Sequence, residues 1–148
     1  MNLFDSLAIS GSALLAERER SEIIATNMAN AETTHTEAGG PYRRREVVFE
    51  SPGASSFRLA LATSNEFRGP TPGSVHISEV VDDPSPAIMR YQPGHPDANK
   101  EGYVAYPAVN PAAEMVDLMG SVRAYQLNAS AVAAAKQMIQ QTIDILKS

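Results

Sequence analysis

The sequence predicts an α+β protein in which long N- and C-terminal helices pack as a coiled-coil pair, with a small Pro/Gly-rich β unit between them. All ten Pro lie between Pro41 and Pro111, so both ends of the 148-residue chain lack the residue that breaks helix interiors. Apolar residues recur in steps of three and four at both ends, whereas short alternating runs and turn residues fill the middle. We therefore expect an N-terminal axial helix (1–31), a β-rich middle domain (32–110) and a C-terminal axial helix (111–148).

The N-terminal helix is expected over roughly residues 2–30. Arg18 and Ser21 interrupt its apolar face, and the mixed charges of residues 17–22 suit a solvated or inter-subunit surface. The face itself consists of Phe4, Leu7, Gly11, Leu14, Arg18, Ser21, Ala25 and Met28.

The C-terminal helix shows the more regular pattern, a heptad line that continues for about four heptads. Asn110 is a plausible N-cap, and Pro111 suits the first helical position. Small residues at 131 and 133–135 would allow another backbone to approach closely. Only Lys136 breaks the line, which runs through Leu118, Val122, Tyr125, Ala129, Val132, Lys136, Ile139, Ile143 and Leu146.

The middle of the chain is expected to form short strands separated by Pro/Gly turns. Within it, a loop is expected over about residues 51–74, and residues 62–74 have the composition of a flexible surface loop. The candidate strands are 46–49, 57–61, 75–81, 88–91 and 103–106.

Composition argues that neighbours complete the core. Leu, Ile, Val and Phe together number 31, close to the share of about 20% at which chains struggle to fold alone, and Ala supplies 22 residues. The net charge of −5 argues against general nucleic-acid binding, and the lack of Cys excludes disulfides and thiolate chemistry. No apolar run is long enough to span a membrane. The first Arg, Arg18, follows the apolar run, so we expect no cleaved leader.

The sequence predicts no enzyme, no cofactor and no metal site. Residues 97–102 imitate the start of a calcium loop, but the twelfth position is Ala108 instead of Glu, so we expect a polar turn. No nucleophile elbow or phosphate-binding Gly loop is visible. The run Arg43–Arg45 is interpreted as a solvated strand start, with contact to an acidic partner as the alternative.

From the residues alone, the chain is a non-enzymatic scaffold whose terminal helices need helical partners. A monomer with an antiparallel helix pair on a small sheet stays open, and so does a soluble coiled-coil adaptor. The oligomeric state of the purified chain would distinguish a coiled-coil adaptor from a subunit of a larger assembly. An adaptor should form a stable dimer or trimer, whereas a subunit should be monomeric with labile terminal helices.

Several segments resemble one family. Residues 24–31 match the "A-(S/T)-N-(L/M)-A-N" signature of flagellar rod, hook and related axial proteins. The Pro-Gly-His-Pro run at 93–96 and the short chain resemble the proximal-rod members more than the longer distal-rod and hook proteins. The chain is thus identified as a member of the flagellar basal-body rod family, and the resemblance covers everything except about residues 51–74. Further matching segments are 3–5, 9–14, 40–49, 83–86, 91–99, 102–104 with Pro107, 114–119 and 123–128.

This resemblance implies a structural protein of the proximal rod that transmits torque from the rotor to the distal rod and hook. It implies export by the flagellar type III system without signal cleavage, a periplasmic location, and assembly with the rod proteins FlgB, FlgF and FlgG, the rod-base protein FliE and copies of itself. Both terminal helices would pack against neighbouring subunits, and Asn27 and Asn30 would satisfy backbone carbonyls at the helix end or bind a neighbour. The residues expected at these packing and subunit interfaces are Leu7, Leu14, Asn27, Met28, Asn30, Leu118, Val122, Tyr125, Val132, Ile139 and Ile143.

Overall fold

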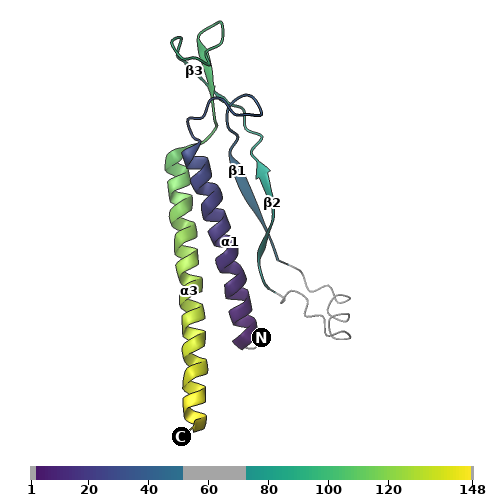
Figure 1. The fold of residues 1–148 in the computed structure, drawn as a ribbon, viewed down its shortest axis with the longest axis vertical. Coiled ribbons are helices and arrows are strands. Elements are labelled where there is room, and N and C mark those ends of the chain that lie inside the picture. The colour runs from purple at the N-terminus through teal and green to yellow at the C-terminus, as the bar shows by residue number, and fades with distance from the viewer. Residues whose placement is uncertain (1–2, 52–72, 148) are drawn as a thin grey trace, which may run out of the picture. The chain divides into compact units, whose positions relative to one another are not determined.

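A computed structural model describes residues 3–51 and 73–147 (Figure 1). It confirms the α+β class, with long helices at the two ends of the chain and short strands between them. The expected strand at 57–61 and nearly all of the loop at 62–74 lie outside the described residues. The elements are α1 (Leu3–Ala29), β1 (Arg45–Glu50), β2 (His76–Asp82), β3 (Ile88–Tyr91), β4 (Tyr103–Tyr106) and α3 (Pro111–Lys147).

The two helices end and begin where local chemistry dictates. After Ala29, the backbone N–H of Asn30 still donates to the Thr26 carbonyl at 3.1 Å, and the chain then turns. At the start of α3, the Asn110 side-chain oxygen accepts a hydrogen bond from the Ala112 N–H at 3.0 Å. This satisfies one of the free donors of the first turn, which confirms the predicted N-cap. In the part of the chain that the structure describes, neither helix is long and apolar enough to cross a membrane.

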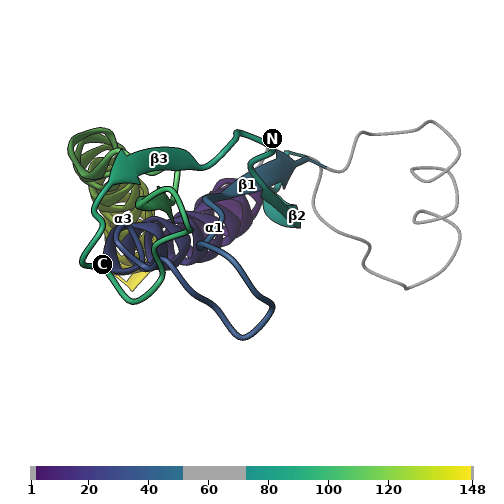
Figure 2. The ribbon, with the colours of Figure 1, turned by 90° about the horizontal axis from the view of Figure 1, so that it is seen from above.

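The chain divides into two compact units, and each contains a segment of α1 beside a segment of α3 (Figures 1 and 2). The first unit comprises residues 1–19, 49–78 and 122–148, and the second comprises 20–48 and 79–121. Strands β1 and β2 form one two-stranded sheet, and β3 and β4 form another.

The second unit holds most of the described core. Its buried apolar side chains come from the helix pair and from the β3–β4 hairpin with its exit: Ile24, Val104, Tyr106 and Val109. The same unit buries the polar side chains of Asn27, Glu114 and Ser121. A core of this composition depends on polar groups that find partners inside it.

The β3–β4 hairpin is antiparallel, with Ile88 opposite Tyr106 and Tyr91 opposite Tyr103. Its loop closes at Gly102, which has φ +82°. A Cβ at this position would lie 2.9 Å from a ring carbon of Tyr91, so both the backbone angle and the space favour glycine.

The first unit has very little large apolar core among its described residues. Its buried apolar side chains there are Ala16 and Ala135, one from each helix. Large side chains on the same helices are exposed, with Leu15 at 70% and Leu146 at 81%. Because burial of large apolar groups drives folding, this helix pair gains little stability from its own packing.

Candidate functional site: a buried polar clasp

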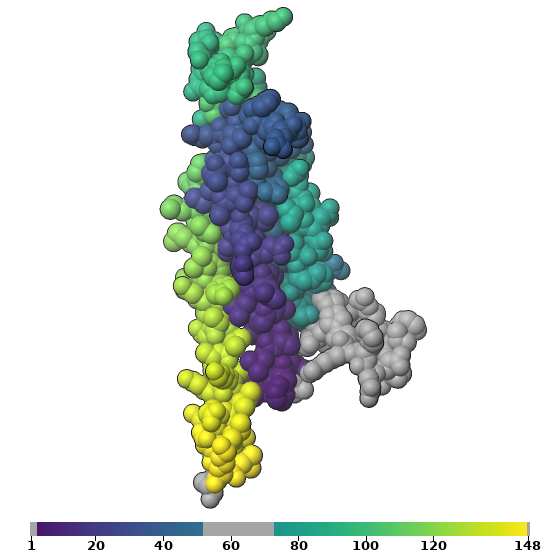
Figure 3. Space-filling model, in the orientation of Figure 1, coloured from purple at the N-terminus to yellow at the C-terminus, as the bar shows by residue number. Residues whose placement is uncertain are grey.

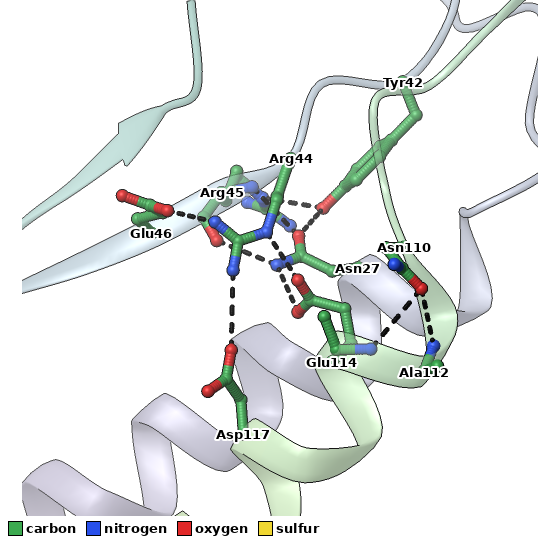
Figure 4. Close-up of polar contacts among 10 residues, drawn as sticks. Asn27, Tyr42, Arg44, Arg45, Glu46, Asn110, Ala112, Glu114 and Asp117 are labelled. Atoms are coloured by element: carbon green, nitrogen blue, oxygen red, sulfur yellow. Dashed lines mark hydrogen bonds and ion pairs between the residues drawn. The ribbon is translucent and has the colours of Figure 1, made fainter. Parts of the chain in front are cut away.

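A cluster of polar side chains joins the end of α1, the start of β1 and the start of α3 in the second unit (Figure 4). We call this cluster the clasp. Its members are Asn27, Tyr42, Arg44, Arg45 and Glu114.

Asn27 is at the centre of the clasp and is 1% exposed. Its Nδ2 donates to the Arg45 carbonyl at 2.8 Å and to Glu114 Oε2 at 3.1 Å. Its Oδ1 accepts from the Tyr42 hydroxyl and from the Arg45 N–H, both at 2.9 Å. All the hydrogen-bonding capacity of a side-chain amide is therefore used, as burial requires.

Glu114 is equally buried, and Arg44 neutralises it. The Arg44 Nε donates to Glu114 Oε1, and its terminal nitrogens pair with Glu46 and, at 3.6 Å, with Asp117. Burial alone would lower the pKa of the Arg44 guanidinium, but the bonds and charges of Glu114 and Glu46 outweigh it, so that pKa is raised. Arg44 therefore remains a cation that compensates the buried carboxylate.

The two helices also meet through hydroxyls close to the clasp. The Oγ atoms of Ser21 in α1 and Ser121 in α3 lie 2.9 Å apart, and Ser121 also donates to the Leu118 carbonyl at 2.9 Å. Ser21, which interrupts the apolar pattern of the N-terminal helix, is thus a helix-contact residue.

The structure separates the two asparagines named from the sequence. The Asn30 amide donates to the Thr26 carbonyl at 2.9 Å, so it satisfies a carbonyl at the helix end as expected. Asn27 instead reaches the backbone of Arg45 in β1 and the carboxylate of Glu114 in α3. Their contacts with neighbouring subunits remain a prediction.

The arginine run was only partly understood from the sequence. Arg43 is exposed, as a solvated strand start requires, but Arg44 turns inward to Glu114 and Arg45 is half-buried beside Tyr42. The acidic group that Arg44 meets lies in the same chain. Sequence reasoning also missed Glu114, which was indistinguishable from the many acidic residues that favour the first turn of a helix.

The other expected interface residues differ in exposure. Val122, Tyr125 and Ile143 are 44%, 42% and 40% exposed. The half-buried residues are Leu7, Leu14, Met28, Leu118, Val132 and Ile139. The fully buried positions of α3 are Glu114, Ser121 and Ala135, which the predicted heptad line does not contain. The role of the heptad line between subunits remains a prediction.

Large apolar side chains stand in solvent along α3. In the second unit, Met115, Val116 and Met119 are 57–68% exposed. In Figure 3 the green side chains at the start of α3 project from the surface along one edge. In the first unit, Leu127 and Ile145 are exposed in the same way. Contiguous exposed apolar residues of this size mark protein-protein contact surfaces.

The calcium-like run at 97–102 forms a turn that uses its own oxygen. Asn99 Oδ1 accepts from the Glu101 N–H at 3.0 Å and from the Tyr103 N–H at 2.9 Å. Across residues 3–51 and 73–147, no three His, Asp or Glu side chains come together as a metal would need.

The comparison with known families first defines the class of protein. Residues 100–145, which include β4, the clasp carboxylate and nearly all of α3, match the C-terminal domain of flagellar basal body rod FlgEFG proteins. The two long terminal helices and their exposed apolar side chains fit a structural subunit of this class.

Full-length relatives narrow the class to one family. The chain is 40% identical to the flagellar basal-body rod protein FlgC of Bacillus subtilis (strain 168), over 99% of this chain and 100% of that protein. It is 32% identical to FlgC of Borreliella burgdorferi and 34% identical to FlgC of Escherichia coli O6:H1, each over at least 96% of both chains. The chain belongs to the FlgC family of flagellar basal-body rod proteins. It is accordingly a structural rod component and not an enzyme.

Proposed function

We propose that this subunit builds the proximal part of the rod, where its axial helices (1–31 and 111–148) pack against neighbouring subunits and the β-rich segment (32–110) faces outward. In this position it carries torque from the rotor to the distal rod and hook. A torque-bearing shaft needs long elements packed side by side along its axis, and α1 and α3 supply them.

The observation that carries this proposal is the exposed apolar flank of the helices. Leu127, Ile145 and Leu146 are 65–81% exposed, while the buried apolar residues described in the same unit are alanines. At about 25 cal/mol per Å², covering such side chains would stabilise an assembled subunit far more than the isolated one. Neighbours in a helical tube would cover them.

The family resemblance supplies the proposed neighbours: FlgB, FlgF and FlgG, the base protein FliE and further copies of this chain. It also supports export through the flagellar type III apparatus and a final location in the periplasm.

Ile139→Asp in a strain that lacks the chromosomal copy tests assembly through the terminal helices. Ile139 is half-buried on α3, and burying an unpaired carboxyl group there in a helix-helix contact would cost about 2 kcal/mol or more of desolvation. We expect loss of rods and of swimming, with normal amounts of the exported protein.

Gln137→Asp is the matched control, because Gln137 is exposed two residues earlier on the same helix. It adds the same charge on a different side of α3 and should allow swimming. If Ile139→Asp cells swim as well as the control, the axial packing of this part of α3 is wrong.

A further inference from the structure

Beside the larger Ile24, several buried positions of the helix pair hold small side chains, which fix a register poorly. Ser21 and Ser121 meet in the second unit, and the buried apolar residues described in the first unit are Ala16 and Ala135. Contacts between side chains this small lose little packing area when the helices shift, so they resist a slide along the axis less than large interlocking side chains would.

The clasp, in contrast, tolerates no slide. One helical turn moves Glu114 by about 5.4 Å along the axis, beyond reach of both Arg44 and Asn27. A buried carboxylate would then face no cation, and the Asn27 amide would lose one of its acceptors. Breaking a buried ion pair in this way is among the most destabilising single changes in a protein.

The position of the clasp suits this role. Asn27 lies in the last turn of α1, and Glu114 lies in the first turn of α3, where its own N–H donates to the Asn110 carbonyl at 3.0 Å. The N-cap and the clasp therefore hold the same turn. The backbone of Arg44 is also fixed, because its carbonyl accepts a hydrogen bond from the Asp83 N–H at 2.7 Å.

We propose that the clasp sets the register of the helix pair within the single subunit, with Glu114 as the positioning residue. A buried polar group is a well-attested way to select one register among several of similar packing energy. The register decides where along α1 the exposed side chains of α3 lie, among them Met115, Val116 and Met119. For this consequence the inference rests on the proposed assembly, whereas the register itself is a property of the isolated chain.

Engineered cysteines can report the register directly, since the chain has no Cys. Ser21→Cys with Ser121→Cys places two thiols where hydroxyls now lie 2.9 Å apart, which is compatible with disulfide geometry. Ser21→Cys with Leu118→Cys places the second thiol one turn earlier on α3. In the purified full-length subunit, we expect the first pair to oxidise at least about tenfold faster, the ratio that one charge-assisted hydrogen bond can maintain.

Glu114→Ala in both cysteine backgrounds tests the clasp. We expect the preference for the Ser121 position to fall about tenfold, toward equal rates, while circular dichroism still shows the helices. A general loss of stability would slow or accelerate both pairs together, so the ratio isolates the positioning role. An unchanged ratio in folded Glu114→Ala protein would overturn the proposal.

Glu114→Gln provides the second variant if Glu114→Ala fails to fold. Gln keeps the size of Glu and an acceptor oxygen but removes the charge that Arg44 compensates, so the ratio should fall by less than in the alanine variant. An unchanged ratio in Glu114→Gln protein would then overturn the inference.

A deletion strain that carries the unaltered chain, together with the cross-linking of the purified chain, distinguishes failure of this inference from failure of the proposed function. If the unaltered chain fails to restore rods in a deletion strain while the cysteine pairs keep their cross-linking preference, the rod proposal fails, but the clasp still sets the helix register. If the unaltered chain restores rods but the engineered cysteine pairs oxidise at equal rates, only the proposal that the clasp sets the register fails.

Discussion

Asn27→Ala is the most informative single test of the clasp. The change removes the Asn27 partner from four hydrogen bonds, which link it to Tyr42, to Glu114 and twice to the backbone of Arg45. At about 1 kcal/mol for each bond, the free energy of unfolding of the second unit should fall by about 4 kcal/mol. A small domain has only about 5–15 kcal/mol of stability, so the loss is large.

Urea denaturation followed by circular dichroism and tyrosine fluorescence measures this loss, since the chain has five Tyr and no Trp. With a slope of about 1–2 kcal/mol per molar urea, the midpoint should fall by about 2 M or more. Hydrogen exchange at the Arg45 amide, which donates to Asn27, should accelerate in parallel.

Asn30→Ala is the matched control, because the half-buried Asn30 bonds only locally, to Thr26 and Thr33. Its loss should cost about 1 kcal/mol. Equal losses for the two variants would refute the central role of Asn27 in the clasp.

Three further predictions concern other local features. Gly102→Ala should lower the melting temperature of the second unit, because the strained φ costs about 1–3 kcal/mol. Gly94→Ala is the control and should have little effect, since nothing lies within 4 Å of an added Cβ there. Equal melting temperatures for the two variants would contradict this prediction. Asn110→Ala should cost about 1 kcal/mol by removing the N-cap of α3, and Asn110→Asp should keep most of it in the same urea titration. Hydrogen bonds from the Ser85 side chain and backbone lower the pKa of Asp83. The Asp83 carboxylate therefore stabilises the fold at neutral pH and loses that effect as the pH falls through its folded pKa. Ser85→Ala should raise the Asp83 pKa measured by NMR, and an unchanged pKa would exclude the Ser85 hydroxyl as the cause.

The sequence predicted the helices and the described strands because their signals are local. Pro residues confined to the middle, turn residues between alternating runs, and the Asn110 cap each act within a few positions of the chain. The bounds of β3 and β4 agree with the predicted segments, and α1 and α3 agree to within a residue or two.

The clasp could not be found in this way, because its residues are far apart in sequence and individually ordinary. Arg44 and Glu114 lie 70 positions apart, and each fits a common surface role in its own segment. The fully buried positions of α3 were missed for a related reason. Periodicity analysis favours large apolar residues, whereas closely packed helices bury small ones such as Ser121 and Ala135.

Deletion of the gene in its host, followed by cryo-tomography of the cell envelope and a swimming assay, tests the central claim most directly. If the chain is a proximal-rod subunit, the cells should stop swimming and keep basal bodies that have a membrane ring but no completed rod. A plasmid copy of the gene should restore both. Normal rods and normal swimming in the deletion strain would contradict the account.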